Sequence, residues 1–291
     1  MNSEEARRHR PWSVALLVAM VLTVLAGAAS AGTLDRIRQE KALRIAFRED
    51  APPFSYKDNL GEPAGFIVDL CRAVAKKLTQ QLSLPSLSVT YVPVTSINRF
   101  DAIREHKADL LCEPTSVTLS RRELVDFSIA TFVDGGSLLI RADGPHDLQA
   151  LAGRKVGVLG GTTTEQELRH TLKDAGISAE VMLAKTHADG MAMLEGGSIS
   201  GYFADRSILA FLLKDAKHPE GLMLADNYLT VEPYALALPH GEEEFRLAVD
   251  RALSHIYRSG ELGPIFEHSF AGVAKPSPML KTLFLISSLP D

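Results

Sequence analysis

Three arginines and one aspartate stand at positions where a charged small molecule could be bound. Arg48 directly follows a short apolar run, Arg99 lies at a predicted helix start, and Arg121 lies in the first turn of a short predicted helix. A helix dipole disfavours a cation at the helix N-terminus, so the position of Arg121 indicates a bound anion nearby. Asp205 ends a predicted strand, where it could receive an ammonium group.

Hydroxyl side chains accompany these charges at two further helix starts. Ser96 precedes Arg99 by three residues, which places both on one helix face. Thr162 and Thr163 open a helix after a glycine turn, and the free backbone N–H groups there form a ready anion site. Thr162 with Glu165 also has the spacing of a capping box.

Each of these residues also has a purely structural interpretation. Arginines are common on protein surfaces, and Thr162 could do no more than cap its helix. Asp205 could cap the helix that begins at Arg206, and a lone histidine such as His187 is more often structural than functional. The functional interpretation gains strength because all these side chains are predicted at the same edge of the sheets.

Short apolar runs alternate with stretches of helical periodicity along most of the chain. Strands are expected over 43–47, 89–92, 108–112, 155–159, 180–183, 201–204 and 234–238. Helices are expected over 66–78, 97–103, 118–124, 162–175, 187–194, 206–213 and 242–259. This alternation predicts an α/β fold of open, mostly parallel sheets with flanking helices, in which ligands bind beyond the carboxyl ends of the strands.

The alternating pattern restarts after Gly135 and returns near 231–233, which predicts two lobes with a crossover and a ligand cleft between them. The C-terminal tail has helical apolar spacing and is expected to pack on its own lobe. The expected division is a signal segment (1–31), a first segment of lobe 1 (32–136), lobe 2 (137–232), a return segment of lobe 1 (233–275) and the tail (276–291).

The first 31 residues have the pattern of a secretory signal. Arginines at 7, 8 and 10 precede an apolar run over 14–25 and the small residues 29–31. An uncleaved membrane anchor is the alternative, but the run is shorter than the roughly 18 residues of a spanning helix. The 31 basic and 36 acidic residues give a net charge of −5, which argues against a nucleic-acid partner.

Export would place the two cysteines of the chain in an oxidising compartment. Cys71 falls in a predicted helix and Cys112 in a predicted strand. One disulfide between them is the only intramolecular bridge available, and two buried thiols are the alternative. No metal site is expected from two thiols without clustered histidines, and phosphate-loop, dinucleotide-binding, HExxH and GxSxG motifs do not occur. We therefore expect no cofactor.

The chain resembles the family 3 extracytoplasmic solute-binding proteins, which are the polar amino-acid receptors of ABC importers. Its nearest resemblance is to the glutamate/aspartate-binding branch. The resembling segments cover nearly the whole chain after the signal segment: FREDAPPFSYKDN (47–59), VTSINRFDAI (94–103), ADLLCEPTSVTLSRR (108–122), FSIATF (127–132), GTTTE (161–165), AKTHADGMAMLEGG (184–197) and FADRSILA (203–210).

The resemblance implies how the two charged groups common to all amino acids would be bound. Arg121 would hold the ligand α-carboxylate in a bidentate contact, helped by Ser116 and by Thr163. Asp205 would pair with the α-ammonium, assisted by the carbonyl group of Pro114. Proline replaces the serine usual at position 114, which removes a hydroxyl and an N–H group but keeps that carbonyl.

The resemblance also implies a contact with the ligand side chain. Glu113 departs from the family pattern, where a small residue is usual: pointing inward it would neutralise Arg48 or Arg99 and weaken the case for an acidic ligand, and pointing outward it would change nothing. The residues that match the side-chain carboxylate positions of the branch are Arg48, Ser96, Arg99 and His187.

The function implied by the resemblance is that of a periplasmic, monomeric, non-enzymatic receptor that closes on glutamate or aspartate. Such a receptor presents the closed form to an inner-membrane ABC permease. The main alternative is an enzyme of the periplasmic cyclohexadienyl (arogenate/prephenate) dehydratase type, with Glu113 as its general acid. A second alternative is a sensing module for a chemoreceptor or histidine kinase.

Overall fold

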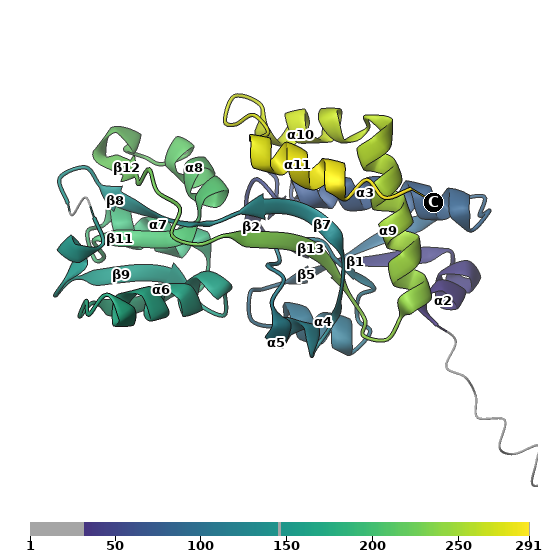
Figure 1. The fold of residues 1–291 in the computed structure, drawn as a ribbon, viewed down its shortest axis with the longest axis horizontal. Helices are drawn as coiled ribbons and strands as arrows, with labels where there is room; N and C mark the ends of the chain where they lie inside the picture. Colours follow the sequence, from purple (N-terminus) through teal and green to yellow (C-terminus); the bar gives the residue numbers. More distant parts are fainter. Residues whose placement is uncertain (1–31, 145–146, 291) are drawn as a thin grey trace, which may run out of the picture.

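The computed structural model describes residues 32–144 and 147–290 and contains two lobes joined by long extended strands (Figure 1). The predicted secretory signal over 1–31 lies outside the described residues. No helix of the described segments combines the length and the apolar content that crossing a membrane requires.

Lobe 1 is built on a five-stranded sheet in the order β5-β1-β6-β13-β7. Four strands point the same way, and β13 runs antiparallel to both of its neighbours. The apolar runs predicted three of these strands closely, although β6 is shorter than expected. The strands are β1 (Ala42–Arg48), β5 (Ser88–Val94), β6 (Leu110–Leu111), β7 (Asp126–Asp134) and β13 (Glu232–Leu238).

Lobe 2 repeats this plan with a sheet in the order β10-β9-β11-β8-β12. Here β8 is the strand that runs against the other four. The expectation of open, mostly parallel sheets is therefore confirmed in both lobes. The strands are β8 (Gly136–Arg141), β9 (Lys155–Leu159), β10 (Glu180–Ala184), β11 (Gly201–Asp205) and β12 (Leu222–Leu224).

Helices cover both faces of each sheet, as the alternating pattern predicted (Figure 1). In lobe 1 they are α2 (Thr33–Glu40), α3 (Phe66–Gln81), α4 (Arg99–Arg104), α5 (Leu119–Arg122), α9 (Glu243–Ser259), α10 (Leu262–Phe270) and α11 (Pro278–Ile286). In lobe 2 they are α6 (Thr163–Asp174), α7 (His187–Glu195), α8 (Arg206–Lys214), and the short 3-10 turns η1 (Gln149–Leu151) and η2 (Pro219–Gly221). The tail helix α11 contacts β7 and α9, so it packs on lobe 1 as expected.

Two extended connections run between the lobes side by side. β7 leads through Gly135 directly into β8, and β13 begins at Glu232, which pairs with Asp134 at the end of β7. A Cβ atom on Gly135 would lie 2.1 Å from the carbonyl oxygen of Thr230, so only glycine permits this close approach.

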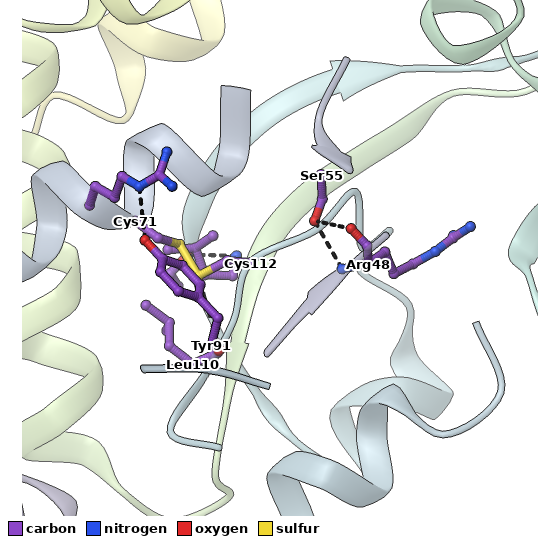
Figure 2. The surroundings of a disulfide bond; sticks show 9 residues. Arg48, Ser55, Cys71, Tyr91, Leu110 and Cys112 are labelled. Carbon is purple, nitrogen blue, oxygen red and sulfur yellow. Dashed lines mark hydrogen bonds between the residues drawn. A yellow bond between two sulfur atoms is a disulfide. The ribbon is translucent and has the colours of Figure 1, made fainter. Parts of the chain in front are cut away.

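A small three-stranded sheet next to the cleft has no counterpart in the predicted elements. It consists of β2 (Asp50–Ala51), β3 (Ser55–Lys57) and β4 (Pro63–Ala64), all antiparallel. The hydroxyl of Ser55 ties it to the end of β1, because it accepts the N–H of Arg48 at 2.9 Å and donates to the Arg48 carbonyl at 3.0 Å (Figure 2). This hairpin fixes the backbone from which the Arg48 side chain extends.

The disulfide Cys71–Cys112 joins α3 to the residue that follows β6 (Figure 2). Of the two alternatives left open by the sequence, the structure contains the bridge rather than two thiols. Both cysteines are fully buried in the core of lobe 1. The bridge fixes the backbone immediately before Glu113, while the Arg48 side chain points away from it (Figure 2).

Candidate ligand-binding site

A small cavity with a free volume of about 10 Å³ lies between the lobes. A volume of this size holds about one water molecule, so a larger ligand requires the lobes to separate. All predicted site residues except Ser96 line it, together with Thr164, which was not predicted. The lining residues are Arg48, Arg99, Pro114, Ser116, Arg121, Thr162, Thr163, Thr164, His187 and Asp205.

The carboxyl ends of strands bring these residues together. In lobe 1, Arg48 is the last residue of β1, and the segment after β6 supplies Pro114. In lobe 2, His187 follows β10 and Asp205 is the last residue of β11. The rule that ligands bind beyond strand carboxyl ends therefore locates this cavity.

Arg121 is the only lining arginine without an acidic neighbour among the described residues, since no carboxylate oxygen there lies within 4.0 Å of it. Its Nη1 donates to the carbonyl oxygen of Ser116 at 2.8 Å, and its guanidinium lies 5.3 Å from the centre of the Phe100 ring. Burial lowers the pKa of Arg121, with Glu113 opposing this effect. Arg121 is therefore a partly buried cation with donors left for an anion.

Arg48 is already paired. Its Nε and Nη2 donate to Oδ1 of Asp50 at 2.9 and 2.6 Å, and its Nη1 lies 3.9 Å from Oε2 of Glu113. The Arg48 side chain is almost fully buried. Asp50 was not among the predicted site residues, although it stands two positions after Arg48 in the sequence.

Arg99 is held by contacts with both lobes. Its Nη1 donates to the carbonyl of Ser96, and its Nη2 donates to the carbonyl of Gly161 in lobe 2 at 3.2 Å. Its Nε lies 3.3 Å from Oε1 of Glu113. Burial lowers the pKa of Arg99 to about 10, although Glu113 acts in the opposite direction.

Glu113 points inward, which answers the question that its sequence position raised. It is fully buried between Arg48 and Arg99, behind the lining residues rather than among them. Its Oε1 accepts a hydrogen bond from the hydroxyl of Thr115, and its Oε2 has no hydrogen-bond partner among the described residues.

Asp205 faces the cavity with an unsatisfied oxygen. It occupies the N-cap position of α8 without a capping hydrogen bond, and its Oδ1 has no partner in the described part of the chain. Burial raises the pKa of Asp205 well above its usual range, and the nearby Asp134 and Glu232 raise it further. Burial also raises the pKa of Asp134 to about 6. A cation in the cavity would stabilise the ionised form of Asp205.

His187 is neutral at physiological pH, because burial, followed by the charge of Arg48, lowers its pKa to about 3. Its Nδ1 lies 2.9 Å from the hydroxyl of Tyr202, whose pKa is raised by burial. The tautomer of the neutral ring decides which of these two groups donates the hydrogen bond. The backbone N–H of His187 donates to Oδ2 of Asp50 in lobe 1 at 3.3 Å.

Thr163 and Ser116 meet across the cleft, with their hydroxyl oxygens 3.1 Å apart. Thr163 also donates to Oε2 of Glu232 at 3.1 Å. Ser96, by contrast, does not line the cavity: its hydroxyl donates to the carbonyl of Gly160 in lobe 2 at 2.8 Å. Ser96 therefore joins the two lobes directly.

Thr162 caps α6 by accepting the N–H of Glu165, and it also lines the cavity. The expected capping box is wrong in one part, because the Glu165 carboxylate accepts the N–H of Gly161 instead of that of Thr162. The left-handed backbone of Gly161 brings its N–H toward Glu165. No group of three His, Cys, Asp or Glu side chains in the described segments is arranged to hold a metal ion.

Two lobes, two strand connections and a charged cavity lined from both sides are the architecture of two-lobed binding proteins. The family description "bacterial extracellular solute-binding proteins, family 3" matches residues 43–272. The chain belongs to this family, as its resembling segments predicted.

Individual relatives cover most of the chain. The L-glutamate/L-aspartate-binding protein of Pseudomonas aeruginosa is 29% identical over 266 residues, which are 91% of this chain and 88% of the relative. The glutamate/aspartate import solute-binding protein of Salmonella typhimurium is 30% identical over 252 residues, covering 86% and 83%. Among solved structures, the ancestral amino acid-binding protein AncCDT-1, a precursor of cyclohexadienyl dehydratase, has a TM-score of 0.72 at 27% identity and covers 82% of this chain and 99% of its own.

Proposed function

We propose that this protein binds a polar L-α-amino acid between its lobes in the periplasm and delivers it to an inner-membrane ABC permease. The observation that carries the proposal is the pairing of Arg121 and Asp205 in one cavity. One is a partly buried cation without an acidic neighbour among the described residues, and the other is a partly buried acid with a buried, unsatisfied oxygen. Together they complement the two charges of an amino acid.

In this proposal the Arg121 guanidinium holds the α-carboxylate, and the hydroxyls of Ser116 and Thr163 add hydrogen bonds from both sides. Asp205 pairs with the α-ammonium, next to the carbonyl group of Pro114. Because these residues come from both lobes, the ligand favours the closed arrangement by its greater affinity for it.

The sequence resemblance favours glutamate or aspartate as the bound amino acid. Two relatives are named for these amino acids, and Arg48, Arg99 and His187 line the end of the cavity assigned to the side chain. The inward orientation of Glu113 weakens this expectation, because it supplies a negative charge at the same place.

A thermal-shift panel of the twenty amino acids and several dicarboxylates tests the proposal. A bound ligand raises the melting temperature by mass action, and we expect a rise with at least one polar amino acid. The substitution Arg121→Gln should abolish the rise, because it leaves a buried carboxylate unpaired at a cost of about 2–5 kcal/mol. The matched control is Arg122→Gln, which changes the exposed neighbouring arginine. No shift with any amino acid, or an equal shift in Arg121→Gln, would refute the proposal.

A dehydratase is the second candidate, and the structural similarity to AncCDT-1 favours its consideration. Its proposed general acid, Glu113, lies behind the lining residues and near two guanidinium groups. A side chain behind the lining residues does not touch a ligand in the cavity. We therefore expect no aromatic product when the protein is incubated with prephenate or arogenate and followed by absorbance.

A further inference from the structure

The end of the cavity that contains Arg48 and Arg99 carries its own counter-charges. Asp50 makes a two-donor contact with Arg48, and Glu113 lies 3.9 Å from Arg48 and 3.3 Å from Arg99. Both arginine side chains are at most 4% exposed and Glu113 is fully buried, so the pairs with Glu113 are shielded from solvent, whereas Asp50 is 21% exposed. A ligand carboxylate that entered this end would therefore compete with Asp50 or Glu113 for contact with either arginine.

The formal charges around the cavity already balance. Arg48, Arg99 and Arg121 contribute three positive charges, and His187 contributes none. The acids that line the cavity or contact its arginines contribute three negative charges when Asp205 is ionised, and these acids are Asp50, Glu113 and Asp205.

A zwitterion with an uncharged side chain keeps this balance. A ligand with a second carboxylate adds one negative charge to a buried site without a free cation to meet it, which is costly. Asp134 and Glu232, which already raise the pKa of Asp205, would increase this penalty. A cationic side chain would face Arg48 and Arg99 instead, and like charges disfavour it.

An aliphatic side chain also suits this end poorly. It would cover the N–H groups of Arg48 and Arg99 without accepting a hydrogen bond, and unsatisfied buried donors are costly. A side-chain amide presents a carbonyl oxygen to such donors and carries no net charge.

We propose that the buried Glu113 and the adjacent Asp50 make this site selective for an amino acid with a carboxamide side chain, glutamine or asparagine, over the corresponding acids. The inference rests on the proposed function and names the ligand class of the same cavity. The proposed amide ligand differs from the glutamate and aspartate that appear in the names of the two relatives described above. The difference arises from charges that this chain itself supplies.

Isothermal titration calorimetry with glutamine, asparagine, glutamate and aspartate tests the proposal on the intact protein. We expect one of the amides to bind at least tenfold more tightly than its acid. Equal or tighter binding of the acid would overturn this inference while leaving the amino-acid receptor function intact. If no α-amino acid binds, the proposed function fails together with it.

The substitution Glu113→Gln removes one negative charge and keeps the size of the side chain. We expect it to shift the ratio of acid to amide affinity at least tenfold toward the acid, and an unchanged ratio contradicts the proposal. Asp50→Asn should shift the ratio in the same direction and serves as the second variant if Glu113→Gln does not fold. An unchanged ratio in a folded Asp50→Asn protein would count equally against the proposal.

Asp109, which lies next to the same strand, provides a matched control. It precedes β6 as Glu113 follows it, and it is likewise buried between two arginines, Arg36 and Arg44. It does not line the cavity. Asp109→Asn should therefore lower stability without altering the acid-to-amide ratio, and a ratio change as large as that of Glu113→Gln would show that the effect is not specific to the site.

Discussion

Asp205 and Arg121 line the same cavity and carry groups of opposite charge. Burial works against the charged form of each, raising the pKa of Asp205 and lowering that of Arg121. A zwitterion relieves both effects at once, because its ammonium favours the carboxylate and its carboxylate favours the guanidinium. Binding of a zwitterion would thereby be coupled to the protonation of Asp205.

Because the pKa of Asp205 is raised in the ligand-free protein, binding of an α-ammonium should release protons, and affinity should increase as the pH rises through that pKa. Calorimetry at pH 6 in two buffers with different ionisation enthalpies measures the release. Asp250→Asn is the control, since Asp250 also has a raised pKa but accepts the N–H of Ile129 far from the cleft. Proton uptake on binding would contradict the assignment.

The same shifts affect the stability of the ligand-free protein. Asp134 has a pKa of about 6 in the folded state, compared with about 3.9 for an unfolded aspartate. Between these values the folded state binds more protons than the unfolded state, so this group makes the free energy of unfolding decrease as the pH rises from about 4 to about 6. Its contribution is greatest below this window and is lost above it.

At the scale of elements, the connection between the lobes depends on close packing of two strands. The substitution Gly135→Ala would place a Cβ atom 2.1 Å from the Thr230 carbonyl oxygen and force the strands apart. We expect a loss of about 1–3 kcal/mol in the free energy of unfolding, measured by urea denaturation. Gly221→Ala is the control, because its added Cβ meets no atom within 4 Å. Equal stability of the two variants would refute this account.

The disulfide stabilises the element that carries Glu113. Cys71 and Cys112 are 41 residues apart, and closing a loop of this size is worth about 4 kcal/mol in the chain-entropy model. The double variant Cys71→Ala/Cys112→Ala should lose stability of this order in denaturant titrations. An unchanged midpoint would mean that the bridge does not restrain the unfolded chain.

The sequence predicted the elements whose signals are local. The strands and helices that alternate along the chain are marked by apolar runs and helical spacing, so their positions were close to correct. β7 and β8 were not predicted, because DFSIATFVD and GSLLIR lack a clear period and their pairing partners lie far away in the sequence. The strands β2 to β4 are too short to leave a pattern.

The sequence predicted those site residues whose positions are determined by the ends of strands. Arg48, His187 and Asp205 follow or end strands, and the structure brings them into one cavity. The pairing of Arg48 with Asp50 was not predictable, since it depends on the β2–β3 hairpin and on a side-chain orientation. Ser96 was expected to contact ligand, but its orientation toward Gly160 depends on how the lobes meet.

At the scale of the whole molecule, the lobes already touch through hydrogen bonds between them. Three such contacts are Ser96 to Gly160, Arg99 to Gly161 and His187 to Asp50. These bonds stabilise the closed arrangement independently of any ligand. They therefore reduce the share of a ligand's binding free energy that is needed to close the lobes.

The substitution Ser96→Ala removes one such bond without changing the cavity lining. We expect ligand affinity to fall by about 0.5–1.5 kcal/mol and the ligand-free protein to become more extended in small-angle X-ray scattering. Ser88→Ala is the matched control, because the Ser88 hydroxyl donates to the Lys41 carbonyl within lobe 1. Unchanged affinity in Ser96→Ala would show that this bond does not contribute to closure.

The position of β13 in the first sheet has a consequence for how the chain assembles. β13 lies between β6 and β7, although it is synthesised after all the strands of the second sheet. The sheet of lobe 1 therefore stays split until the last quarter of the polypeptide arrives, whereas every strand of lobe 2 is available earlier. We therefore expect lobe 2 to fold first during synthesis. The late insertion of β13 then completes the sheet of lobe 1 and the second connection between the lobes.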